Sequence, residues 1–97
     1  MLLFADKEMT KPVEDLDFGI VLAGTTKTVE YYLYNDSIAD TVDIIPSVSH
    51  EDVKILTCPK TLKSKEVSKV EFSWTPSLTL KKGLKTLLGL KYYEIYE

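Results

Sequence analysis

The sequence predicts an all-β protein built as a sandwich or a barrel, and three observations favour this fold class. Several short runs alternate apolar with polar residues, and β-branched and aromatic side chains are frequent within them. Gly, Pro, Asn and Asp interrupt these runs at short intervals, as turns between strands require. The length of 97 residues suits one core. We therefore expect a single domain over residues 1–97.

Residues 16–21 and 28–34 predict two strands, joined by a connection that contains Gly24. The second run ends at Asn35, where Asn, Asp and Ser in succession are typical of a turn. Successive side chains of a strand point to opposite faces, so one face of this run is expected in the core and the other outside. The expected core face is Val29, Tyr31 and Leu33, and the outer face is Glu30, Tyr32 and Tyr34.

Three further strands are expected over residues 41–48, 53–57 and 66–74. Pro46 indicates an edge strand or a bend, because proline lacks the N–H that an inner strand needs. Pro76 closes the last of these runs for the same reason. The expected inner faces are Val42, Ile44, Pro46 and Val48 in the first run and Val70, Phe72 and Trp74 in the last.

Residues 84–96 fit either a long strand or, with Leu80 included, a basic amphipathic helix. We favour the strand, because Gly83 and Gly89 would each cost a helix about 1 kcal/mol and the tyrosines prefer a pleated surface. Both faces of such a strand would be apolar or aromatic. They are Leu88, Leu90, Tyr92 and Tyr96 on one side and Leu87, Tyr93 and Ile95 on the other.

Composition narrows the class of protein. The single cysteine, Cys58, excludes an intrachain disulfide, and the first residues do not resemble a signal peptide. No run approaches the roughly 18 apolar residues of a membrane span, so a soluble protein without a membrane partner is expected. All twelve basic residues are lysines, and the net charge is −3. Without arginine forks and with an acidic balance, nucleic-acid binding is not expected.

Charge is uneven along the chain, with an acidic first half and a lysine-rich second half. In a sandwich the two halves interleave, so the charges are expected to scatter over solvated faces. The alternative is a head-to-tail assembly in which unlike ends of neighbouring subunits meet.

The residues do not indicate an enzyme, and no cofactor or metal is expected. Ser49, His50, Glu51 and Asp52 contain the letters of a catalytic triad, but neighbours in one loop do not form the line that a triad needs. Their spacing also lacks a metal-site pattern. Cys58 is expected to be a small buried hydrophobe.

One set of residues, taken in order, resembles the ASH and major-sperm-protein group of immunoglobulin-like domains. The set is Leu16-Asp17-Phe18-Gly19, then Gly24, Asn35, Trp74-Thr75-Pro76 and Gly83, within a match over about residues 13–92. The resemblance implies an immunoglobulin-like β-sandwich of about seven strands. It also implies that Leu16 and Phe18 enter the core, that Gly19 and Gly24 adopt backbone angles that side chains forbid, and that the Asn35 side chain ties down its loop.

The chain departs from this group in one respect, because members usually have a final strand after the one that residues 84–96 would match. Either residues 2–5 fill the gap, or a sheet edge stays open and serves as a template for another chain. The last residues would otherwise only finish the domain's own sheet. We expect a subunit interface made by strand pairing at the C-terminal run. Its candidate residues are Leu2, Phe4, Tyr32, Tyr34, Leu88, Leu90, Tyr92, Tyr93, Ile95 and Tyr96.

The function expected from these observations is structural. The chain would be a non-enzymatic subunit that binds other protein subunits, an oligomer within a larger assembly. By analogy with small immunoglobulin-like proteins of viral particles, the first expectation is a head, neck, tail or decoration protein of a phage virion. The alternative is a cytoplasmic adaptor of a cytoskeletal or ciliary assembly, where the resembled group is also common.

Overall fold

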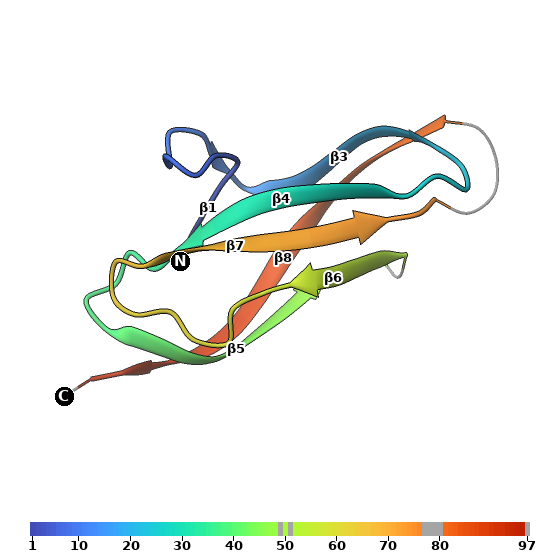
Figure 1. The fold of residues 1–97 in the computed structure, drawn as a ribbon. Coiled ribbons are helices and arrows are strands. Elements are labelled where there is room, and N and C mark those ends of the chain that lie inside the picture. Colours follow the sequence, from blue (N-terminus) through green and yellow to red (C-terminus); the bar gives the residue numbers. More distant parts are fainter. Residues whose placement is uncertain (49, 51, 77–80, 97) are drawn as a thin grey trace.

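The computed structural model confirms the all-β prediction and has two antiparallel sheets packed face to face as a sandwich (Figure 1). It describes residues 1–48, 50, 52–76 and 81–96, with only the backbone at residues 81–83 and 85. Within these residues the strands are β1 (Leu2–Phe4), β2 (Pro12–Val13), β3 (Asp15–Leu22), β4 (Lys27–Tyr34), β5 (Asp40–Val48), β6 (Val53–Thr57), β7 (Val67–Trp74) and β8 (Lys81–Ile95). The larger sheet has the order β2-β1-β4-β7-β6, and the smaller has the order β3-β8-β5.

The core lies between the sheets and contains the residues that alternation predicted for β4 and β7. Tyr31 and Leu33 of β4 are buried, and so are Val70, Phe72 and Trp74 of β7. The smaller sheet contributes Leu16, Phe18, Val21 and Ile44 to the same cluster. The rings of Phe18 and Trp74 meet at 5.8 Å between centroids, which joins the two sheets near the centre of the core.

Gly19 and Gly24 have the left-handed backbone that was expected of them, with φ of +67° and +80°. Gly19 follows an irregularity in the register of β3, where the Asp17 carboxylate accepts the N–H of Gly19 at 2.8 Å. This bulge reverses the alternation, so that Val21 is buried and Ile20 is 76% exposed. Gly24 turns the chain toward β4, and its N–H donates to the Pro76 carbonyl at 2.9 Å.

β5 is an edge strand of its sheet, as Pro46 indicated. Its alternation is also interrupted, because Asp43 has a positive φ of 52° and the register shifts between Val42 and Ile45. Thr41 and Ile44 are the buried residues on either side of this bulge, while Val42 is half-buried. The regular alternation expected over residues 41–48 is therefore wrong before Asp43, since an extra residue changes which side chains face inward.

The C-terminal run is a strand and not a helix. β8 extends over 15 residues and runs obliquely across the larger sheet (Figure 1). The expected pleat is confirmed where side chains are described, because Leu88, Leu90 and Tyr92 pack against the core while Leu87, Tyr93 and Ile95 are exposed. Leu80, which would have extended a helical face, lies outside the described residues.

The N-terminal segment does not complete the smaller sheet. β1 pairs with β4 of the larger sheet, Leu3 facing Leu33 and Phe4 facing Tyr32. The alternative in which residues 2–5 pair with the C-terminal strand is therefore wrong. Alternation alone does not specify which strand a short apolar segment joins.

Candidate functional site

The two halves of β8 pair with different strands. Leu87 faces Asp15 at the start of β3, and residues 81–87 continue along that strand. Leu88 faces Val48 at the end of β5, and the pairing continues to Ile95, which faces Asp40. Within the described chain, each half of β8 therefore has a strand on one edge only.

Hydrogen bonds on the far side of β5 reveal which edge of residues 88–95 is open. The Thr41 N–H donates to the Leu62 carbonyl at 2.8 Å, and the Leu62 N–H donates back to Thr41 at 3.0 Å. A strand residue directs both of its backbone groups to one side, and its neighbours direct theirs to the other. Thr41 faces Glu94, so both residues direct their groups away from each other. The residues of β8 that turn their backbone groups away from β5 are thus Leu88, Leu90, Tyr92 and Glu94.

β3 occupies the first part of this same edge. The Tyr31 hydroxyl accepts the N–H of Asp17 at 2.7 Å and donates to its carbonyl at 3.2 Å, so the backbone groups of Asp17 point away from β8. Burial raises the pKa of Tyr31, which keeps this hydroxyl protonated and able to donate. The next pair, Leu16 with Thr86, is then the hydrogen-bonded one, and Thr86 directs its groups toward β3.

Thr86 and Leu88 are two residues apart and therefore direct their groups to the same edge. β3 begins at Asp15, opposite Leu87, and no strand of the described chain continues beyond it. Four N–H and four C=O groups, those of Leu88, Leu90, Tyr92 and Glu94, consequently emerge along an edge without a neighbouring strand. We call this the open edge.

The chain before β3 leaves this edge because it changes sheets. β2 pairs with β1, Val13 facing Leu3 and Pro12 facing Phe4, so residues 12–13 belong to the larger sheet. The separation leaves a cleft of about 540 Å³ between the sheets, next to the open edge. The cleft is lined by Met1, Leu2, Leu3, Pro12, Val13, Glu14, Leu33, Leu88 and Leu90. Eight of these nine residues are apolar, but the surface that lines the cleft is partly polar, which suits an extended strand with both apolar side chains and polar backbone groups.

β5, by contrast, is covered on its outer edge. The segment around Leu62 bonds to Thr41 as described, and the Ile44 N–H donates to the Lys60 carbonyl at 3.0 Å. The buried amide of Asn35 holds this segment, because its Nδ2 donates to the carbonyls of Ala39 at 2.9 Å, Leu62 at 3.2 Å and Lys63 at 3.2 Å. The expectation that the Asn35 side chain ties down its loop is confirmed.

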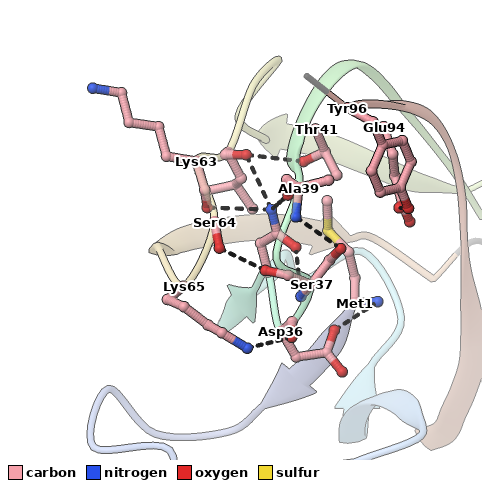
Figure 2. Close-up of polar contacts among 12 residues, drawn as sticks. Met1, Asp36, Ser37, Ala39, Thr41, Lys63, Ser64, Lys65, Glu94 and Tyr96 are labelled. Atoms are coloured by element: carbon pink, nitrogen blue, oxygen red, sulfur yellow. Dashed lines mark hydrogen bonds and ion pairs between the residues drawn. The ribbon is translucent and has the colours of Figure 1, made fainter.

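Further polar contacts close the same end of the sandwich (Figure 2). The N-terminal amine contacts the Asp36 carboxylate at 3.3 Å and lowers the pKa of that group, chiefly through a hydrogen bond. The Ser64 hydroxyl donates to the Ser37 carbonyl at 2.7 Å. Glu94 and Tyr96, at the end of β8, hydrogen bond to each other close to this loop (Figure 2). The open edge therefore ends beside an ordered part of the structure.

The structure brings together only part of the predicted interface. Leu88, Leu90 and Leu2 line the cleft, Tyr92 is half-buried beside the core, and Tyr93, Ile95 and Tyr96 are 50–70% exposed. Phe4, Tyr32 and Tyr34 instead share the outer face of the larger sheet, and the register places Leu2 opposite Tyr34 on that same face. Phe4 is only 9% exposed and packs edge-on against Tyr34, with 6.5 Å between ring centroids, so it offers a partner little surface.

Sequence reasoning identified only the part of an apolar outer face of the smaller sheet that belongs to the last run. Of the ten large apolar side chains that are exposed in the described part of the chain, six belong to this sheet: Ile20, Leu22, Ile45, Leu87, Tyr93 and Ile95. Exposed apolar surface of this kind marks interaction sites. The bulge at Gly19 hid Ile20 and Leu22 from a simple alternation pattern, because it moves them to the outer face.

Of the residues that carry the letters of a catalytic triad, the structure describes His50 and Asp52. His50 Nδ1 accepts the N–H of Asp52 at 3.1 Å, and its ring lies edge-on to Trp74 with 6.3 Å between centroids. Ser49 and Glu51, which completed the triad letters, lie outside the described residues. Nowhere in the part of the chain that is described do three His, Cys, Asp or Glu side chains gather to hold a metal ion. Nor does this part contain a helix long and apolar enough to cross a membrane.

Cys58 packs against the core, and the reactivity of its thiol is testable. It is half-buried against the core, and burial raises the pKa of its thiol. Because the thiolate is the reactive form, we expect Cys58 in the native protein to react with iodoacetamide at pH 8 more slowly than free cysteine. Mass spectrometry of timed samples measures the rate, and unfolding in urea should restore the speed of free cysteine. Native labelling as fast as that of the free thiol would instead indicate an activated nucleophile.

Comparisons with protein-family models, curated proteins and solved structures found no match to the chain.

Proposed function

We propose that this protein is a non-enzymatic structural domain that binds other protein subunits by accepting a β-strand at the open edge. The observation that carries the proposal is the row of backbone groups on Leu88, Leu90, Tyr92 and Glu94 beside a cleft lined mainly by apolar residues. Unpaired strand edges recruit strands from other chains, and the main-chain hydrogen bonds supply much of the affinity.

The cleft would supply specificity. A strand added beside residues 88–95 directs every second side chain toward the space between the sheets. Those side chains would cover Leu88 and Leu90, which are half-buried in the chain alone. Complete burial of each leucine contributes at most about 1–2 kcal/mol beyond the hydrogen bonds, since part of each side chain is already covered. A partner segment with apolar residues at alternate positions therefore fits best.

We also propose which group of domains this protein belongs to and in which kind of assembly it acts. A two-sheet sandwich, left-handed glycines at positions 19 and 24, and the Asn35 network support membership of the ASH and major-sperm-protein group of immunoglobulin-like domains. An open edge together with an apolar outer face suits a repeated subunit, and we favour a structural protein of a phage virion, by analogy. The number of symmetry-related copies in the assembly tests this, because a cytoplasmic adaptor would hold one defined partner.

Strand acceptance is tested with a soluble nine-residue peptide that alternates valine with threonine and ends in lysine. Added to isotope-labelled protein at millimolar concentration, it should shift and protect the amides of Leu88, Leu90, Tyr92 and Glu94 in nuclear magnetic resonance spectra. The amides of Lys91 and Tyr93 should change less, since they already face β5. Unchanged signals at all four open-edge amides would contradict the proposal.

Two proline variants form a matched pair for this experiment. Glu94→Pro removes an N–H on the open edge and should weaken the peptide about tenfold while leaving the fold intact, because an unpaired edge tolerates proline. Tyr93→Pro removes an N–H that faces Val42 of β5 and should instead lower the melting temperature. Equal effects of both variants on folding would show that the two edges of β8 were assigned wrongly.

A further inference from the structure

We infer that the strand that fills the open edge is β8 of a second copy, so that two chains pair edge to edge across a twofold axis. This inference rests on the proposed function and names the partner. A twofold arrangement satisfies two identical edges at once, since each copy supplies the strand that the other lacks. A strand from an unrelated protein would satisfy only one.

The position of β3 limits the register of such a pair. Asp15 already lies opposite Leu87, so the second copy's β8, which ends at Ile95, has room only opposite Leu88 and later residues. The inner face of each β8 must also continue as the inner face of the other. A shift of one strand by a single residue would pair inner with outer residues, so such registers are excluded. Among the remaining registers, the one with the most paired residues places Tyr92 opposite Tyr92 of the second copy.

The backbone groups agree with this register. Tyr92 faces its own equivalent, and Leu90 faces Glu94 of the second copy. All three residues direct their groups to the open edge, so each facing pair exchanges two hydrogen bonds. A shift by one residue would set Leu90 opposite Tyr93, whose groups already point to β5 of its own chain.

Charges and side chains along the pair are compatible as well. Residues 88–96 carry one lysine and one acid, Lys91 and Glu94, so two copies of this segment do not repel through net charge. Lys91 lies opposite Tyr93 of the second copy on the outer face, where a cation near an aromatic ring is favourable. Gly89 lies opposite Ile95, and no lysine or acid directly faces a like charge. On the inner face, Tyr92 lies beside Tyr92 of the second copy, and Leu90 of each copy lies opposite Glu94 of the other.

The oligomeric state tests the inference directly. Sedimentation velocity of the full chain between about 1 µM and 1 mM should show a dimer, and Glu94→Pro should shift it at least tenfold toward monomer with an unchanged circular dichroism spectrum. A dimer that persists undiminished in Glu94→Pro overturns the inference. A protein that stays monomeric overturns it too, and binding of the valine-threonine peptide to that monomer would leave the proposed function standing.

Disulfide trapping tests the register. In a Cys58→Ser background, Tyr92→Cys should form a cross-linked dimer under mild oxidation, because facing Cα atoms in a hydrogen-bonded pair lie about 5.5 Å apart, within disulfide range. Tyr93→Cys is the matched control, since Tyr93 is more exposed than Tyr92 and faces Lys91 of the second copy. Random collisions would cross-link the exposed position faster. A Tyr93→Cys dimer that forms as fast as the Tyr92→Cys dimer therefore contradicts the pairing.

Discussion

Replacing Phe72 with alanine is expected to lower the free energy of unfolding by about 4 kcal/mol, the largest loss that we predict for a single substitution. Phe72 is fully buried in β7, with β4 and β6 on either side and the smaller sheet across the core. Truncation removes the ring from apolar surroundings and leaves a cavity that the neighbouring strands fill only in part. Chemical denaturation in urea, followed by tryptophan fluorescence, measures the change.

Ile38→Ala is the control for this substitution. Ile38 is also a large apolar residue but is 85% exposed, so its truncation should change the free energy of unfolding by less than about 0.5 kcal/mol. Small domains are stable by only about 5–15 kcal/mol, so Phe72→Ala should remove at least about a quarter of the total stability. A loss below about 2 kcal/mol would mean that the core is packed differently around β7.

The second large effect is expected at Asn35, whose side chain is buried and fully bonded. Its Nδ2 donates to three carbonyls, and its Oδ1 accepts the N–H of Ser37 at 3.0 Å. Asn35→Ala should cost about 2–3 kcal/mol, because buried carbonyls lose their donor. Asn35→Asp should cost more at neutral pH, since a carboxylate of the same shape would face three carbonyl oxygens and donate to none.

Denaturation in urea and amide hydrogen exchange both report on the Asn35 variants. Exchange at Thr41 and Leu62 should accelerate in each variant, because Asn35 holds the segment that covers β5. Ser37→Ala is the control, since it removes a partly buried hydroxyl that accepts one N–H, from Ala39, and should cost about 1 kcal/mol. An aspartate variant as stable as the native protein would contradict the assigned orientation of the amide.

Strand positions and the centre of the core were predictable from short-range pattern. The runs expected at residues 16–21, 28–34, 53–57 and 66–74 differ from the observed strands by only a residue or so at each end. Alternation identifies these strands because a strand that is buried on one face carries an apolar side chain at every second position. The left-handed angles at Gly19 and Gly24 and the bonded amide of Asn35 followed from the resemblance to a known group.

Alternation failed where the chain inserts an extra residue. At Gly19 and at Asp43 a bulge moves the residues on one side of it to the opposite face, which hid the exposed Ile20 and the buried Thr41. The sequence shows a glycine at only one of these two positions. Asp43 adopts its positive φ without one, so no local pattern marks that bulge.

The candidate site divides in the same way between sequence and structure. The sequence by itself determined that the last run is extended and apolar on both faces. Both properties depend only on residues that are close together in the chain and on the two-residue period of a strand. Only the tertiary structure decided that β8 changes partner between Leu87 and Leu88, that β1 joins the larger sheet, and that a cleft opens where β2 departs. Strand pairing joins residues that are far apart in the chain. The free energy that favours one pairing over another therefore depends on several segments together and cannot be inferred from one of them.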